Sequence, residues 1–270
     1  MKALLSVSFG TSHADTRAKT IDAIDAELAA AFPDRTFYSA WTSSRIAAKV
    51  RAERGEHHDT LDEASERLSA DGVDDLVVST MCLIQGGEMR KVAHALATWV
   101  AGGGRTARLA KPLMSSAADR DALAQVLCDE FADVPEEDAA LFMGHGTSEP
   151  GCTGANGVYA QLQDGLAALG RERFFVATVE GEPAFDDVLS LIKSCGAQRV
   201  QLAPLMIVAG DHAKNDLAGD GDDSWANRLA ACGFKVKVEL KGLGEYAGVR
   251  ALACQHAREA VVFDCVESDA

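Results

Sequence analysis

The sequence is short of positive charge. It holds 26 Lys and Arg residues against 41 Asp and Glu residues, which gives a formal net charge of −15. Nucleic-acid binding requires a basic surface that neutralises phosphates, so nucleic acid is not an expected partner. A small polyanionic ligand is compatible with this composition if basic residues gather locally.

Two further absences concern membranes and nucleotides. No apolar run approaches membrane-spanning length, and no signal-peptide pattern precedes the first strand, so we expect a cytoplasmic protein without a membrane partner. Neither Gly-x-Gly-x-x-Gly nor Gly-x-x-x-x-Gly-Lys-Ser/Thr follows a predicted strand. This disfavours a dinucleotide or ATP as a cofactor.

The cysteines lack a Cys-x-x-Cys pair, and their number is odd. Scattered cysteines in a cytoplasmic protein favour buried, reduced thiols over disulfides or a thiolate zinc site. The seven stand at positions 82, 128, 152, 195, 232, 254 and 265.

What the sequence does contain is an alternation of strands and helices. Its 270 residues, 47% of them hydrophobic, can supply the cores of two domains. Apolar runs alternate with stretches of helical spacing, such as a predicted helix over 15–32, which favours an α/β fold with doubly wound parallel sheets. We predict two similar domains, 1–134 and 135–270, with an active-site cleft between them. The last helix, at about 245–263, could pack back on the first domain.

An internal duplication supports the two-domain prediction. Residues 4–12 read as an apolar strand followed by Gly-Thr-Ser, and residues 141–148 repeat this order. The second copy has His145 where the first has Phe9. Only the second copy therefore places an imidazole in a glycine-flanked turn at the rim of a sheet.

Three polar side chains follow successive predicted strands of the second half, namely His145, Glu180 and His212. Ligands of open parallel sheets bind beyond the carboxyl ends of the strands, and successive strands are usually neighbours, so we expect these side chains to converge. Two imidazoles and one carboxylate suit a divalent transition metal with open coordination positions. The same groups can accept protons near neutral pH.

Other polar residues have simpler interpretations. A single histidine in a glycine-rich turn is more often a hydrogen-bonded loop residue than a ligand, and only the matched positions of two histidines favour a site. Glu182 precedes Pro183 and is expected to cap the next helix or to face solvent. His57 and His58 are interpreted as surface residues or as support for a site. The aspartates after His212 lack the spacing of a calcium loop and are interpreted as solvated; they are Asp211, Asp216, Asp220, Asp222 and Asp223.

Longer motifs run the length of the chain. They are Ser-Phe-Gly-Thr-Ser at 8–12, Gly-His-Gly-Thr at 144–147, Val-Glu-Gly at 179–181, Pro-Leu-Met at 204–206, and the stretch from Ala-Gly-Asp-His-Ala to Asn-Asp-Leu-Ala-Gly-Asp at 209–220. Together they resemble the class II tetrapyrrole chelatases, and most closely the anaerobic sirohydrochlorin cobaltochelatases of the CbiK type.

The resemblance implies ATP-independent insertion of Co(II) into sirohydrochlorin, in the anaerobic route of cobalamin biosynthesis. It implies His145, Glu180 and His212 as the metal ligands, and we take His145 as the base, with Glu180 helping to remove protons. The ligand set also tolerates Fe(II) or nickel, so a ferrochelatase-type reaction that makes sirohaem stays open. The family commonly has a histidine near Gln85, and this chain has Cys82 in that place.

Sirohydrochlorin carries many carboxylates, so positive side chains should face it. The basic residues that follow predicted strand ends are Arg45, Lys49, Arg90, Lys91 and Lys214. In the first half, the positions expected to bind the tetrapyrrole are Gly10, Thr11, Ser12, Arg45, Gln85, Gly86 and Glu88. A homo-oligomer is left open. Two other classes compete with an enzyme of this kind: a non-catalytic tetrapyrrole or metal carrier, and a hydrolase with a zinc-bound water.

Overall fold

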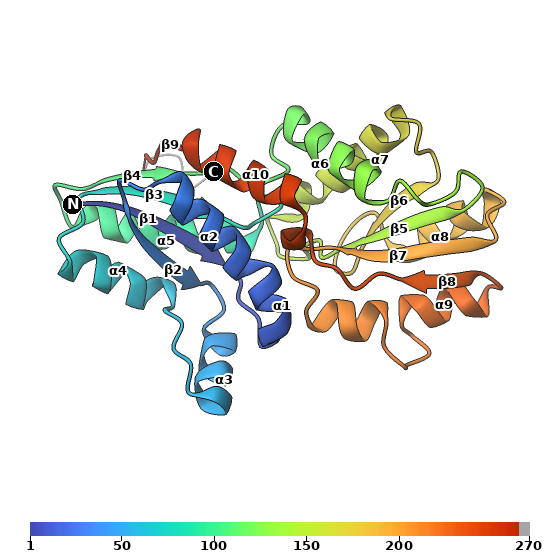
Figure 1. Cartoon of the computed structure of the whole chain (residues 1–270), viewed down its shortest axis with the longest axis horizontal. Coiled ribbons are helices and arrows are strands. Elements are labelled where there is room, and N and C mark those ends of the chain that lie inside the picture. The colour runs from blue at the N-terminus through green and yellow to red at the C-terminus, as the bar shows by residue number, and fades with distance from the viewer. Residues whose placement is uncertain (265–270) are drawn as a thin grey trace. The chain divides into compact units, whose positions relative to one another are not determined.

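The computed structural model describes residues 1–264. The chain divides into two compact units, shown in Figure 1. The first unit consists of Met1–Leu113 together with the chain from Arg250 on, and the second unit is Met114–Val249. Cys265 and the end of the sequence-predicted second domain lie outside the described residues.

The division differs from the sequence-based boundary between residues 134 and 135. The helix α6 (Ala117–Glu130) belongs to the second unit. Its end is anchored there because Phe131 packs edge-on against Phe142 of β5 (Ala139–Gly144), with ring centroids 4.9 Å apart. Composition alone places the boundary after this helix, because the sequence pattern does not reveal which unit α6 packs against.

The first unit is built on a five-stranded sheet with the order β2-β1-β3-β4-β9. The first four strands are parallel, and β9 is antiparallel to β4. The strand β9 was not predicted, because only two residues form it. The strands are β1 (Lys2–Ser8), β2 (Thr36–Trp41), β3 (Asp75–Thr80), β4 (Thr106–Leu109) and β9 (Val261–Val262).

The second unit repeats this arrangement in a four-stranded parallel sheet with the order β6-β5-β7-β8. In both units the first strand lies in the middle, between the second and the third. The internal duplication read from the sequence is therefore present in the topology. The remaining strands are β6 (Phe174–Thr178), β7 (Arg199–Leu205) and β8 (Lys235–Val238).

Helices connect the strands throughout residues 1–264. In the first unit they are α1 (Ala14–Lys19), α2 (Ile21–Ala31), α3 (Ser44–Arg54), α4 (Leu61–Ala70) and α5 (Gly87–Ala101). In the second they are α6, η1 (Thr153–Asn156), α7 (Gly157–Ala168), α8 (Phe185–Ser194), the π-helix η2 (Ala213–Leu217), α9 (Trp225–Ala231) and η3 (Leu243–Glu245), and α10 (Ala247–Arg258) follows.

Three predicted elements were too long. The helix predicted over 15–32 is broken at Thr20, whose side-chain hydroxyl donates to the Thr16 carbonyl (2.7 Å) and whose backbone is not helical. The apolar runs at 76–84 and 200–208 predict two strands of the same lengths, but these strands end at Thr80 and Leu205. Their apolar continuations lie in loops, because hydrophobic runs do not by themselves mark where hydrogen-bonded pairing stops.

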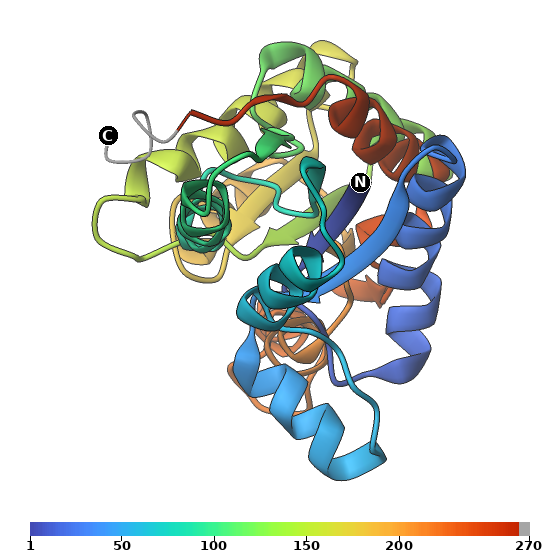
Figure 2. The same cartoon turned by 90° about the vertical axis from the view of Figure 1, so that its left-hand side faces the viewer.

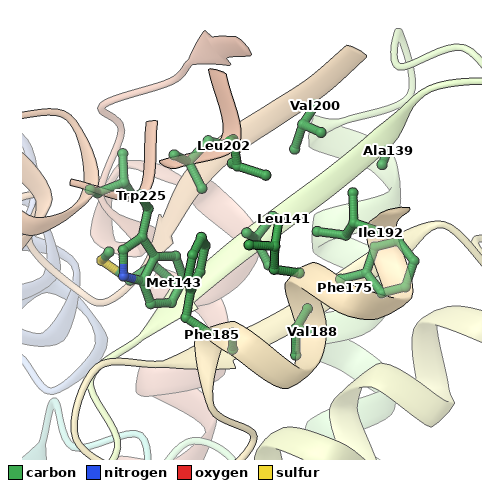
Figure 3. Close-up of a cluster of buried hydrophobic side chains, with 14 of the residues drawn as sticks. Ala139, Leu141, Met143, Phe175, Phe185, Val188, Ile192, Val200, Leu202 and Trp225 are labelled. Atoms are coloured by element: carbon green, nitrogen blue, oxygen red, sulfur yellow. The ribbon is translucent and has the colours of Figure 1, made fainter. Parts of the chain in front are cut away.

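Each sheet is covered on both faces, as a doubly wound fold requires. In the second unit, Leu141 and Met143 of β5 face a cluster formed by α8 and α9, where Phe185 and Trp225 lie 4.5 Å apart (Figure 3). Phe142 points to the opposite face, toward Phe131. Every residue of β5 is buried, as expected for a central parallel strand. Burial of each large apolar side chain contributes about 1.5–3 kcal/mol, so this core holds the strand ends in place.

The first unit has the same two layers. Residues of α4 and α5, among them Leu68 and Leu96, pack on one face of its sheet. Figures 1 and 2 show α10 beside α2 on the other face. There the Arg250 guanidinium pairs with the Glu27 carboxylate at 2.5 Å.

Two sequence-based expectations can be compared with the described residues. Six cysteines are free thiols: Cys82, Cys128, Cys152, Cys195, Cys232 and Cys254. Within residues 1–264 no helix combines the length and the apolar character needed to cross a bilayer.

Candidate active site

The turn after β5 presents His145 at the carboxyl end of the central strand of the second unit. Gly146 has φ +74°, and a Cβ at this position would lie 2.9 Å from Thr178 Cβ and 3.0 Å from the Gly181 nitrogen. No other residue fits without moving these neighbours. The Gly146 N–H donates to the Tyr159 hydroxyl (3.3 Å), which ties the turn to α7. His145 is half-buried at this rim.

The exit loop of β6 lies directly against this turn. The Val179 N–H donates to the Gly144 carbonyl (3.0 Å), and the Glu180 N–H donates to the His145 carbonyl (2.8 Å). These bonds continue the pairing of β5 and β6 past the ends of both strands. The backbone of Glu180 is therefore fixed beside that of His145, while its side chain is exposed.

His212 arrives from the third strand, β7, which flanks β5 on its other side. The rings of His145 and His212 meet edge to face, with centroids 4.7 Å apart and planes at 86°. The convergence predicted for the two histidines is thus present in the structure. One assumption behind it was wrong: β6 and β7 are successive in the chain but are not neighbours, because β5 lies between them.

Both imidazoles are held through the same ring atom. His145 Nδ1 lies 2.9 Å from the Gly146 carbonyl oxygen, and His212 Nδ1 lies 2.5 Å from Asp216 Oδ2. A carbonyl and a carboxylate only accept hydrogen bonds, so each Nδ1 carries the proton and donates it. The Nε2 lone pair of each ring is then available to a metal ion or to a proton. Histidine ligands in metal sites are commonly held in this way.

The ligand atoms of the three predicted ligands do not form a tight cluster in this structure. Among the described residues, the ligand atoms of three His, Cys, Asp or Glu side chains come within 4.8 Å of one another in one group, which contains His57, Asp59 and Glu63. The set of His145, Glu180 and His212 is not such a group. The rings of His145 and His212 are in contact, and the Glu180 side chain is exposed.

The group at His57 belongs to the start of α4 in the first unit. Glu63 accepts from the Thr60 N–H (2.9 Å) and Thr60 caps Glu63 in return, which is a capping box. The buried Asp59 carboxylate accepts from Arg67 (2.8 Å) and contacts His57 Nε2 (2.8 Å). Each carboxylate already has a structural partner, so we do not assign this group a metal.

His58 also has a structural place. Its ring stacks on Trp41 with centroids 3.8 Å apart. Desolvation, with the nearby Arg17 guanidinium, lowers the pKa of His58. Phe37, Tyr38 and Ser39 line a cavity of about 260 Å³ beside this loop, together with Arg67, His57, His58 and Asp59. The interpretation of both histidines as surface or supporting residues agrees with these contacts.

The acidic loop contains the residue that sequence reasoning missed. Asp216 was interpreted with its neighbours as solvated, whereas it hydrogen-bonds His212. The spacing of four residues between His212 and Asp216 was the available signal, because residues at i and i+4 share a face when the chain is helical. The long glycine- and aspartate-rich loop gave no helical periodicity to suggest this. Glu182 is exposed, as the second of its two interpretations predicted, and its carboxylate accepts from the Ala184 N–H just before α8 (2.9 Å).

The corresponding turn of the first unit follows β1. Gly10 has φ +88°, and a Cβ there would lie 2.6 Å from the Trp41 ring. Thr11 Oγ1 accepts from the His13 N–H (3.2 Å). Ser12 is contacted by two basic side chains of α3: Arg54 donates to its carbonyl (2.7 Å), and Lys49 Nζ lies 3.5 Å from its hydroxyl.

The loop after β3 holds the other predicted substrate-side positions. Gln85 is exposed, Gly86 caps the start of α5, and Glu88 pairs with Lys91 at 2.7 Å. Burial and the nearby Glu88 carboxylate raise the pKa of the Cys82 thiol to about 12. A thiol of this kind stays protonated, and the thiolate is the form that binds metals. Burial thus favours the protonated form of Cys82 in the metal-free protein, and the substrate-side assignments stay predictions.

Comparison with known proteins identifies the family of this chain. The sequence model of one family, Cobalt chelatase (CbiK), matches residues 2–262. The sirohydrochlorin cobaltochelatase of Salmonella typhimurium is 37% identical over 262 residues, covering 96% of each chain. The sirohydrochlorin cobaltochelatase CbiKC of Nitratidesulfovibrio vulgaris is 28% identical over 265 residues, covering 96% of this chain and 90% of the relative.

Solved structures show the same fold at low identity. SirB from Bacillus subtilis with Fe3+ superposes with a TM-score of 0.66 at 13% identity, covering 96% of this chain and 95% of SirB. CbiX, described as the terminal enzyme of sirohaem biosynthesis in denitrifying bacteria, gives 0.57 at 18% identity, covering 96% and 100%.

The duplicated parallel sheets and the two imidazoles at neighbouring strand ends define a chelatase-type α/β protein. Within that class the chain belongs to the CbiK family of cobalt chelatases, because the family match spans nearly the whole sequence.

Proposed function

We propose that the chain catalyses the ATP-independent insertion of Co(II) into sirohydrochlorin. The observation that carries the proposal is the pair His145 and His212, with ring centroids 4.7 Å apart and each Nδ1 engaged by an acceptor. Membership of the CbiK family and the name of the Salmonella relative supply the substrate and the metal.

The reaction exchanges one metal ion for two protons. Co(II) leaves its water and protein ligands for the four ring nitrogens, and two pyrrole N–H groups lose their protons. His145 Nε2 can first hold the metal and then accept a pyrrole proton when the metal has moved to the ring. Its Nδ1–H bond to the Gly146 carbonyl stays in place in both steps, so the ring keeps its orientation.

His212 and Glu180 complete the proposed metal site. His212 binds through Nε2, and the Glu180 carboxylate reaches the same ion from the neighbouring loop, whose backbone is bonded to His145. Because Glu180 is exposed, its rotamer is free to move between the metal and solvent, which suits a group that also carries protons away. A site of two imidazoles and one carboxylate releases a divalent cation more readily than a thiolate cage does.

The substrate carboxylates need positive partners despite the net charge of −15. Arg45 and Lys49 stand four residues apart on α3 and are both exposed, so they share one face of this helix. Lys49 also reaches the Ser12 hydroxyl in the loop after β1. We propose this face as the first carboxylate-binding surface, with Arg90, Lys91 and Lys214 as further candidates.

Absorption spectroscopy of the protein mixed with sirohydrochlorin and Co(II) tests the proposal. A chelatase converts the spectrum to that of the metallated product over many turnovers. A carrier shifts the spectrum in proportion to protein only, and a hydrolase changes nothing. Parallel reactions with Fe(II) and Ni(II) rank the three metals, and faster turnover with Fe(II) would assign the chain to sirohaem synthesis instead.

A further inference from the structure

Asp216 makes the shortest contact to either imidazole of the candidate site. Its Oδ2 lies 2.5 Å from His212 Nδ1, and the two side chains are 46% and 39% exposed. Even an ion pair between side chains this exposed contributes little to folding, about 0–1 kcal/mol. The contact therefore has little value as a stabilising bond, although it sets the direction of one imidazole.

The π-helix η2 explains why these two residues meet. Ala213 and Leu217 are fully buried, and Leu217 is part of the hydrophobic core of the second unit. The Gly219 N–H donates to the Asn215 carbonyl (3.0 Å) and closes the turn. The buried pair Ala213 and Leu217 fixes the turn on the core, and His212 and Asp216, one residue earlier in each case, share the adjoining side. Single π turns inside helical segments are frequent at functional sites.

The two imidazoles are oriented by different means. His145 donates to a backbone carbonyl in the turn that follows it, which no side-chain substitution can remove. His212 depends on one side chain, because its Nδ1 partner is the Asp216 carboxylate. Without that acceptor the ring can rotate about χ2 and carry Nε2 away from His145.

We propose that Asp216 is the positioning residue of the metal site. It holds His212 in the Nδ1–H tautomer with Nε2 directed to the ion, and its charge partly balances that of the bound dication. Asp216 itself does not touch the metal or the tetrapyrrole. The inference rests on the proposed function to the extent that His212 is a metal ligand.

Co(II) binding to the full-length protein tests this role without the tetrapyrrole. We expect Asp216→Ala to raise the dissociation constant for Co(II) by about 10–100-fold, the loss typical when the outer partner of a metal-bound histidine is removed. The ligand-field absorption of bound Co(II) should change as well, because His212 is released. Asp222→Asn is the matched control: it removes one charge from the same exposed loop and leaves the bond between Asp216 and His212 intact. Equal affinity of wild type and Asp216→Ala would overturn the proposal.

Asp216→Asn separates position from charge. An amide oxygen can accept from Nδ1–H, so this variant should recover part of the affinity lost in Asp216→Ala. If the two variants bind Co(II) equally weakly, the carboxylate acts by charge alone and the positioning role is wrong. In turnover, the KM for Co(II) should rise while the KM for sirohydrochlorin stays within about twofold, because the bond between Asp216 and His212 orients a ligand of the metal alone. Should wild type bind Co(II) but not metallate sirohydrochlorin, the proposed function fails, and the binding comparison still decides the role of Asp216.

Discussion

The turns at the carboxyl ends of the two central strands, β1 and β5, have similar backbones but carry different side chains. Each is followed by a glycine with positive φ, Gly10 at +88° and Gly146 at +74°, packed against the exit of the neighbouring strand. Between strand and glycine stands Phe9 in the first unit and His145 in the second. Phe9 is 52% exposed and offers no lone pair, whereas His145 faces a second imidazole. The repeated backbone presents one side chain at the same position in each unit. An imidazole at this position offers a lone pair to a metal ion, and a phenyl ring does not.

The loops after the third strands of the two units, β3 and β7, also carry different side chains. After β7 the chain brings His212 and its partner Asp216. After β3 it brings Cys82, and burial favours the protonated form of its thiol. The duplicated fold therefore carries the two histidines proposed as metal ligands in one copy.

The largest expected effect comes from giving the turn of the second unit the side chain found in the first. His145→Phe places the residue of the first unit in the turn of the second, and we expect turnover to fall by about 10²–10⁴-fold, since a general base is lost. The thermal midpoint should stay close to that of wild type, because His145 lies in a turn outside the core. Spectrophotometric insertion assays measure the first and circular dichroism the second. His94→Ala, which removes an exposed imidazole from α5, is the control, and near-normal turnover of His145→Phe would exclude His145 from the mechanism.

The next effect sharpens the comparison of the two glycines. Gly146→Ala and Gly10→Ala should each lower the free energy of unfolding by about 1–3 kcal/mol, because a Cβ is strained at positive φ. Their added Cβ atoms would also lie within 3.0 Å of Thr178 and Trp41 respectively. Thermal denaturation measures the loss of stability, and titration with Co(II) distinguishes the two variants. Gly146→Ala should weaken binding through His145, and equal weakening by Gly10→Ala would contradict the confinement of the metal site to the second unit.

A third difference lies inside the sheets. Ser6 of β1 stands where β5 has Phe142, and beside Ser6 the helix α2 brings Asp25. Desolvation, with the nearby Asp22 carboxylate, raises the pKa of Asp25 to about 7 from an ordinary value near 4, although the Ser6 hydroxyl favours its charged form. The folded state then binds a proton more tightly than the unfolded state. Stability from this group is fully present below pH 4 and is lost as the pH rises toward and through 7.

Asp25→Asn should remove this pH dependence. The slope it removes cannot exceed about 1.4 kcal/mol per pH unit between pH 4 and 7. Urea unfolding at several pH values, followed by far-ultraviolet circular dichroism, gives the slope. Asp22→Asn, on the exposed side of the same helix, is the comparison variant and should leave most of it. A wild-type stability that rises steadily from pH 4 to 7 and an unchanged profile in Asp25→Asn would together refute the assignment.

The smallest effect is expected at Cys82. Because its thiol stays protonated, Cys82→Ala should change the Co(II) affinity and the turnover by less than about twofold. Thiol labelling under native conditions offers a second measurement, in which the exposed Cys232 should react first and Cys82 should react slowly. A strong loss of Co(II) binding in Cys82→Ala would show that the first unit does supply a ligand.

Much of this architecture follows from local patterns. The apolar run of β5 and the glycines around His145 predict a buried strand with a presented histidine, because buried parallel strands and positive φ leave direct marks in composition. The break at Thr20 has a weaker sequence signal, since neither proline nor glycine stands at or beside this position. The two-residue β9 has no recognisable sequence signal, because its pairing with β4 joins residues more than 150 positions apart in the chain.

The amino-acid sequence by itself determined the alternation of strands and helices, the repeat, and the two histidines that could bind a metal, since each depends on the order of neighbouring residues. Only the tertiary structure decided that β5 lies between β6 and β7, that the centroids of the two rings are 4.7 Å apart, and that Asp216 holds His212. Those outcomes depend on which strands pair and on how a loop packs on its core. Contacts between distant parts of the chain set both, and the local sequence offers at most a spacing, such as the four residues between His212 and Asp216.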